Sequence, residues 1–170
     1  MRGHPGWIRS GWACAVATAG ALLAVPATAR GETLLPGVGV SESLTLPGVT
    51  HYAVYIYAGA TLAFQLGERW YLSPSLYLEI APEVGRGGGL ATLTLSRTIG
   101  TWGTADLIGS FAHDQDHLDF GSSIFSAGLG GGVSILAGDH LVVSPSVSVF
   151  RVVDDASWSL TPALAVGYLL

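Results

Sequence analysis

Apolar and polar residues alternate with a period of two along most of the chain after residue 30. In the segment 70–80 (WYLSPSLYLEI), one set of alternate positions is almost entirely apolar, and the other consists of Tyr, Ser and Glu. Neighbouring side chains of a β-strand point to opposite faces, so this pattern predicts strands with one apolar and one polar face. It indicates an all-β protein. A soluble sandwich with its apolar faces inward gives the same alternation, so the pattern alone does not decide where those faces point.

Short turns and more polar loops separate the strands in strict alternation. Each tight turn contains a glycine, which tolerates the positive φ that hairpins favour; the turns are 66–70, 99–104 and 137–141. The polar or glycine-rich loops lie near 47–51, 82–89, 113–119 and 154–157. The strands predicted between them are 34–46, 51–66, 70–81, 90–98, 104–112, 119–136, 141–152 and 157–170. Membrane barrels of the bacterial outer membrane combine short turns, longer loops and an even number of strands from eight upward.

An internal sequence repeat is consistent with eight strands. GERWYLSPSLYL at 67–78 recurs as GDHLVVSPSVSV at 138–149, an offset of 71 residues. In a meander this offset corresponds to four strands with their connections, so the two copies are expected on opposite sides of the barrel. Pro74 and Pro145 lack the N–H that a central strand donates, so we expect a bulge or a register that tolerates its loss.

The first 29 residues have the three zones of a secretory signal. Arg2 and Arg9 supply positive charge, residues 15–25 are apolar, and residues 27–29 (Ala-Thr-Ala) have the small-x-small pattern that signal peptidase recognises. The apolar run has about eleven residues, whereas a helix that spans a bilayer needs about 20. We therefore expect residues 1–29 to be a removable signal and 30–170 to form one barrel domain. An uncleaved anchor is the alternative.

Composition favours apolar faces that point outward. The chain is 49% hydrophobic and only 11% charged, which is apolar for a soluble domain, yet no run of 18 apolar residues after residue 29 predicts a membrane helix. Burial of each large apolar side chain in lipid stabilises the protein by about 1.5–3 kcal/mol relative to exposure to water. If the apolar faces point to lipid, Tyr57, Thr61 and Ser110 face the interior. A soluble barrel requires the reverse, because soluble monomers do not tolerate apolar patches of this size. We predict a single antiparallel up-and-down transmembrane β-barrel of about eight strands.

Aromatic residues and two charges bear on this orientation. The aromatics cluster near strand ends, as in the two interface girdles of membrane barrels, although they also suit an ordinary core. They are Trp70, Trp102 and Tyr168 near the turns, and Tyr52, Phe120 and Trp158 near the loops.

Glu42 and Arg97 take lipid-facing positions, which at the midplane costs about 2–4 kcal/mol for Arg and less for Glu. Arg97 can reach the interface from a strand end, whereas Glu42 fits poorly and leaves the place of the first strand in the barrel open.

Charge and cysteine content exclude several classes of function. All seven basic residues are arginines, and residues 30–170 carry five of them against twelve acidic residues, a net charge of about −7. This is the wrong sign for a protein that binds nucleic acid. The single cysteine, Cys14, lies within the expected signal and ahead of most of its apolar run. We therefore expect no lipid anchor there, and no disulfide, thiolate metal site or cysteine nucleophile in the mature chain.

One predicted loop is a candidate metal site. Imidazole and carboxylate groups crowd into it at a density that can hold a divalent cation: His113, Asp114, Asp116, His117 and Asp119. The spacing defines no particular cage. An exposed acidic loop at the cell surface is the alternative.

A second candidate site is the polar interior, into which Glu79 and Asp106 are predicted to point. With Arg69, Arg97 or Arg151, these carboxylates would form a salt-bridge network that plugs the lumen. A catalytic carboxylate pair is the other interpretation, but nothing else in the sequence suggests hydrolysis. GRGGG at 85–89 lacks the context of a phosphate-binding loop and is better read as a flexible loop. No cofactor is expected.

The last strand carries the most specific motif. Counting back from the end, Leu170, Tyr168, Val166 and Leu164 alternate with Leu169, Gly167, Ala165 and Ala163. This resembles the final strand of small outer-membrane barrels of the OmpA and OmpX type, which ends on an apolar or aromatic residue with Tyr two positions before it; Leu170 stands where Phe is usual. The resemblance implies a location in the bacterial outer membrane, contact with its lipid and lipopolysaccharide, and recognition of this strand by the barrel-assembly machinery.

A structural or surface role without catalysis is the function expected, because an eight-stranded interior is just wide enough for side chains to fill it. One alternative is a narrow channel or a transporter of small apolar ligands. Another is a soluble periplasmic lipocalin-like binding barrel. Outer-membrane barrels that deacylate lipid A use a His-x-Ser pair near the chain end, and this chain has no histidine after His140. Ser123, beside the histidine-containing loop, is the one residue left for such a role.

Overall fold

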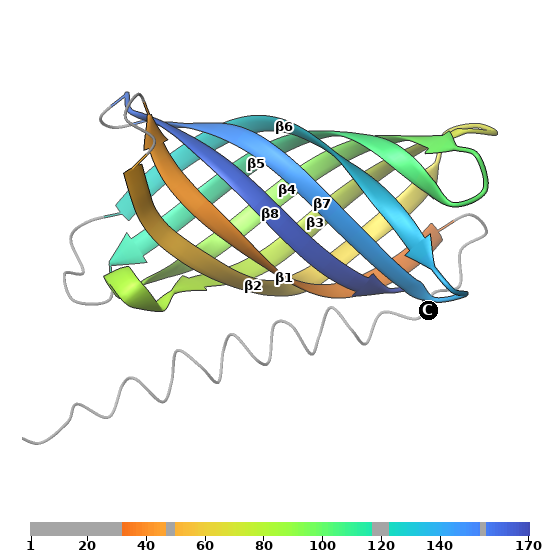
Figure 1. Cartoon of the computed structure of the whole chain (residues 1–170), viewed down its shortest axis with the longest axis horizontal. Helices are drawn as coiled ribbons and strands as arrows, with labels where there is room; N and C mark the ends of the chain where they lie inside the picture. The colour runs from red at the N-terminus through yellow and green to blue at the C-terminus, as the bar shows by residue number, and fades with distance from the viewer. Residues whose placement is uncertain (1–31, 47–49, 117–122, 154–155) are drawn as a thin grey trace, which may run out of the picture.

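Eight antiparallel strands close into one barrel in chain order, and they run obliquely to its long axis (Figure 1). The computed structural model describes residues 32–46, 50–116, 123–153 and 156–170, so the expected signal at 1–29 lies outside the described residues. The strands are β1 (Glu32–Leu46), β2 (Thr50–Gln65), β3 (Trp70–Ala81), β4 (Arg86–Ile99), β5 (Gly103–Asp116), β6 (Ser123–Ala137), β7 (Leu141–Val152) and β8 (Trp158–Tyr168). The short 3-10 helix η1 (Pro82–Val84) lies between β3 and β4. The predicted eight-stranded all-β barrel is confirmed. No helix in the described ranges is long and apolar enough to cross a membrane.

The ring closes through the pairing of the first strand with the last. β1 pairs with β2 on one side and with β8 on the other, from Gly37 opposite Gly167 to Leu46 opposite Trp158. A closed ring has no free edge, so no row of unpaired backbone N–H and C=O groups remains. β1, whose Glu42 fitted the sequence pattern poorly, is therefore a full member of the barrel.

Turns and loops follow the predicted alternation, with two corrections. Gly100 and Gly138 have φ values of 61° and 75°, as expected for these turns, whereas Gly67 in the remaining turn is not at positive φ. Two strands, β4 and β5, also extend further toward the loops than predicted. Residues 86–89 belong to β4 and residues 113–116 to β5. The prediction of a flexible loop at 85–89 was wrong for 86–89, because these residues pair with both β3 and β5.

Two prolines interrupt the strand pairing without shifting its register. Pro74 stays paired with Leu93 of β4, and Pro145 with Leu164 of β8. On the other side, the ladders with β2 and β6 omit each proline and the serine before it, then resume in the same register. Because proline has no N–H to donate, pairs are lost only toward one neighbour. The strands that contain the two copies of the repeat, β3 and β7, lie on opposite sides of the ring.

Buried side chains are few, and most of them are small. Among the described residues, the buried hydrophobic side chains are four alanines and two tyrosines, and no large side chain is completely buried. They are Ala53, Ala60, Ala81, Ala112, Tyr55 and Tyr57. The barrel therefore has no packed apolar core of the kind that holds soluble domains together.

Gly88 permits a close approach of β4 to β5. A Cβ atom at this position would lie 1.9 Å from the backbone oxygen of His113, which cannot yield as a flexible side chain would. At the adjacent Gly89, a Cβ would meet nothing nearer than the backbone oxygen of Tyr77 at 3.8 Å.

We expect Gly88→Ala to lower the free energy of unfolding by about 1–3 kcal/mol, the usual cost of overpacking. The matched change Gly89→Ala should alter it by less than about 0.5 kcal/mol, as at sites without close neighbours. Denaturant unfolding followed by tryptophan fluorescence measures both values. Equal stabilities of the two variants would contradict the close approach at Gly88.

Candidate functional site: the barrel interior

The barrel encloses a hollow of about 820 Å³. Its lining extends from Thr101 and Leu169 beside the short turns to Tyr52 and Ser157 beside the loops. Mostly odd-numbered residues of β1, β2, β3 and β8 and even-numbered residues of β4 to β7 face it, as the alternation predicts. Side chains do not fill the interior completely, because most of the lining residues are small.

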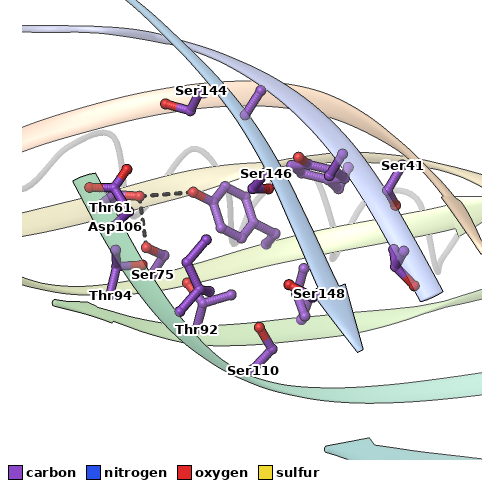
Figure 2. A pocket seen from close by; sticks show the side chains of 18 of the residues that line it. Ser41, Thr61, Ser75, Thr92, Thr94, Asp106, Ser110, Ser144, Ser146 and Ser148 are labelled. Carbon is purple, nitrogen blue, oxygen red and sulfur yellow. Dashed lines mark hydrogen bonds between the residues drawn. The ribbon is translucent and has the colours of Figure 1, made fainter. Parts of the chain in front are cut away.

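About half of the residues in this lining carry a hydroxyl group. Figure 2 shows serine and threonine side chains from several strands around the hollow. Those labelled are Ser41, Thr61, Ser75, Thr92, Thr94, Ser110, Ser144, Ser146 and Ser148. The Oγ1 atom of Thr61 lies 2.8 Å from Ser75 Oγ and 2.9 Å from the hydroxyl of Tyr77. Such groups both donate and accept hydrogen bonds, so the surface can be wetted without fixed charge.

Two aromatic rings lie against the barrel wall, where glycines make room for them. A Cβ on Gly39 would be 2.3 Å from the ring of Tyr57, and one on Gly128 would be 2.8 Å from the ring of Phe150. Tyr57 also packs edge-on against Tyr77, with ring centroids 5.3 Å apart. Because these rings occupy space that other residues would fill with their own side chains, they leave more of the hollow open.

Asp106 lies in the half of the hollow next to the turns, where hydroxyl groups meet both of its oxygens. Thr104 Oγ1 donates to Oδ1 at 2.7 Å, and Ser134 Oγ donates to Oδ2 at 2.6 Å. Ser144 extends this network, with its hydroxyl 2.9 Å from that of Ser134. The carboxylate is therefore held by uncharged partners.

Glu79 and Asp114 face each other in the half next to the loops. Gly88 lies opposite both of them in the strand pairing, and its lack of a side chain leaves the space between them open. Both are buried, with 6% and 9% of their surface exposed, and their carboxyl groups are close enough to interact. The Tyr55 hydroxyl donates to Asp114 Oδ2 at 3.1 Å, whereas Asp114 Oδ1 is buried without a hydrogen-bond partner among the described residues.

The arginines expected beside these carboxylates lie elsewhere. Arg97 sits over the ring of Trp70 and Arg151 over that of Trp158, each 5.7 Å from the ring centroid and paired across neighbouring strands. Arg69 lies exposed in the turn between β2 and β3. The predicted salt-bridge network with these three arginines is therefore wrong, because none of them lines the hollow.

Among the described residues, Arg86 is the arginine that lines the hollow, near its loop end. Its guanidinium donates to the hydroxyl of Tyr52 and lies 5.6 Å from the centroid of that ring. Tyr52 is the extra residue of β2 where the register with β1 shifts between Ser43 and Leu44. This irregularity brings it to the lining of the hollow despite its even number.

Glu42 has a partner that the sequence did not reveal. One ring nitrogen of His51 lies 3.0 Å from the carboxylate of Glu42, and the other lies 3.1 Å from that of Glu83 in η1. All three side chains are exposed, and His51 and Glu83 are beside the loops. The charge of Glu42 is therefore linked to the loop end of the barrel and is not isolated in the apolar band.

The structure separates two of the five predicted metal ligands. His113 does not line the hollow, and its ring lies 4.5 Å from that of Phe125, while the next residue, Asp114, faces inward. Adjacent strand residues point to opposite faces, so these two side chains cannot share one ion. Of Asp116 only the backbone is described, and His117 and Asp119 lie outside the described residues. Within the described ranges, no group of three or more His, Cys, Asp or Glu is placed to hold a metal.

No protein-family model and no curated protein matches the chain. Several solved structures do share its architecture. The N-terminal β-barrel domain of Pseudomonas aeruginosa OprF matches with a TM-score of 0.50 and 14% identity, over 80% of this chain and 97% of that domain. Neisserial surface protein A matches with a TM-score of 0.52 and 8% identity, over 82% of this chain and 97% of that protein.

A de novo designed transmembrane β-barrel is similar to the same extent, with a TM-score of 0.51 and 12% identity, over 84% of this chain and 98% of the design. At such low identity these likenesses concern the fold. The architecture expected from the resemblance of the last strand is confirmed at this level. The chain has the fold of the small eight-stranded barrels of the bacterial outer membrane.

Proposed function

We propose that the protein is an integral barrel of the bacterial outer membrane without a catalytic role. The observation that supports this is its apolar outer surface. Each strand presents at least one large apolar side chain that is 46% or more exposed: Val38, Ile56, Leu76, Leu93, Leu107, Leu129, Val147 and Leu164. A soluble monomer does not tolerate such a continuous apolar exterior, whereas in lipid each side chain contributes about 1.5–3 kcal/mol. This surface argues against the soluble lipocalin-like alternative.

Aromatic residues at both ends of the barrel support a membrane position. Trp70, Trp102 and Tyr168 are exposed beside the turns, and Trp158 is exposed at the loop end. Of the other two aromatics predicted for the loop end, Tyr52 lines the hollow instead, and Phe120 lies outside the described residues. Aromatic girdles of this kind mark the two membrane interfaces of outer-membrane barrels. The arginines that sit over Trp70 and Trp158 keep their charge at these interfaces, where it costs little.

The partners we propose are outer-membrane lipid, lipopolysaccharide and the barrel-assembly machinery. Tyr168 and Leu170, the residues that carry the terminal motif, are both exposed on the outside of the barrel. The motif is therefore accessible to a receptor from the membrane side.

A second function is favoured by the hollow: a narrow passage for water and small polar solutes. Residues beside the turns and residues beside the loops both line it, and most of its lining residues are hydroxyl-bearing or small. A barrel with only a structural or surface role has no need of such an interior, although it can contain one. Conductance distinguishes the two roles.

The membrane location is tested by fractionating cells that produce the protein. We expect it in the outer-membrane fraction, with faster gel migration before heating than after, because a closed barrel resists detergent until it is heated. A water-soluble periplasmic species without heat-dependent migration would contradict the proposal.

Leu129→Arg tests the lipid-facing surface near the middle of β6. In lipid bilayers we expect it to lower the free energy of unfolding by about 2–4 kcal/mol, whereas Ile135→Arg, next to a turn, should cost about 0–1 kcal/mol. Equilibrium unfolding in urea with lipid vesicles measures both values. Equal costs at the two depths would argue against a membrane-spanning band.

Ser146→Trp tests the passage. Ser146 lines the hollow and its neighbour Val147 is exposed on the outside, so Ser146→Trp should reduce single-channel conductance in planar bilayers while Val147→Trp leaves it unchanged. A wild-type protein that inserts without conducting would support the purely structural role.

A further inference from the structure

The hollow is lined by more acidic groups than basic ones. Among the described side chains, the lining includes three carboxylates, Glu79, Asp106 and Asp114, against the single guanidinium of Arg86. That guanidinium lies toward the loop end and contacts Tyr52 through a hydrogen bond and a cation–π interaction. The remaining lining residues are uncharged, so the net charge of the interior is negative.

The Glu79–Asp114 pair differs from Asp106 in what it offers to a solute. Hydroxyl donors occupy both oxygens of Asp106. In the pair, Tyr55 satisfies Asp114 Oδ2, but Oδ1 has no partner among the described residues, although Asp114 is only 9% exposed and lines the hollow. Two neighbouring carboxyl groups in a buried site share a proton, which leaves one negative charge on the pair. A buried charge needs a counter-charge, so this site favours occupation by a cation.

Two buried tyrosines that line the hollow flank the pair. Tyr57 is opposite Glu79 in the pairing of β2 with β3, and the hydroxyl of Tyr55 reaches Asp114. These are the two large hydrophobic side chains that are buried among the described residues. Because Glu79 and Asp114 also line the hollow, a solute that moves along it passes close to both carboxyl groups.

We propose that the hollow selects small cations over anions, and that the Glu79–Asp114 pair is its main selectivity site. This inference rests on the passage proposed above. Carboxylates that line a narrow pore attract cations and exclude anions, because the low-dielectric wall strengthens their field. Asp106 adds negative potential in the other half, and Arg86 opposes it near the loop mouth.

The test is the reversal potential of wild type and of the isosteric variant Glu79→Gln/Asp114→Asn in planar bilayers under a KCl gradient. We expect the reversal potential of wild type to be shifted from zero toward the equilibrium potential of K⁺. In the double variant, the permeability ratio of K⁺ to Cl⁻ should fall close to one. Arg86→Gln should raise the ratio above that of wild type, because it removes the positive charge in the hollow.

Glu42→Gln is the matched control. It makes the same chemical change near the same end of the barrel, but on a carboxylate outside the hollow, so the ratio should stay at the wild-type value. Heat-dependent gel migration of each variant establishes that the barrel has formed before its selectivity is compared.

The outcomes separate the two proposals. A folded wild-type protein that shows no conductance overturns the passage and this inference together. A conducting wild type that prefers anions, or a double variant with the wild-type ratio, overturns the inference alone. A ratio that falls equally in the double variant and in Glu42→Gln would also overturn it, because the effect would then come from net charge and not from the pair.

Discussion

The pairing of β1 with β8 is the interaction on which the rest of the structure depends. An open sheet in an apolar surrounding would leave two rows of backbone N–H and C=O groups without partners, at a cost of several kcal/mol for each group. Closure removes both edges. Once the ring is closed, the period-two alternation sends one set of side chains outward and the other inward on every strand. The apolar exterior and the hydroxyl-lined hollow are two consequences of this constraint.

Whether a closed ring of eight strands is filled or hollow depends on the size of the inward residues. Here they are mainly serine, threonine, alanine and glycine, and two of the larger rings lie against the wall. Tyr57 uses the space above Gly39, and Phe150 uses that above Gly128. Strand number therefore sets the diameter of the barrel, while residue size decides how much of the interior stays open to water.

Most of the charged side chains discussed above have a specific interaction partner. On the outside, Arg97 and Arg151 sit over interface tryptophans, and Glu42 is paired with His51. Inside, hydroxyl groups hold Asp106, and Arg86 engages Tyr52. Asp114 departs from this pattern, because one of its oxygens is buried without a partner among the described residues. Buried polar atoms are seldom left unpartnered, which is why selectivity is best sought at this point.

The sequence by itself determined the strands, the three turns, the apolar exterior and the inward positions of Glu79 and Asp106, because alternation and turn chemistry are local properties of the chain. Only the tertiary structure decided that Glu79 meets Asp114 across Gly88, that Arg97 sits over Trp70 and that His51 links Glu42 to Glu83. Each of these contacts joins residues of different strands or loops, so it depends on the register between them. The sequence pattern fixes the face on which a residue lies, but not the neighbour that it meets there. For the same reason, residues 113–116 looked like a loop until their pairing with β4 and β6 placed them in the barrel wall.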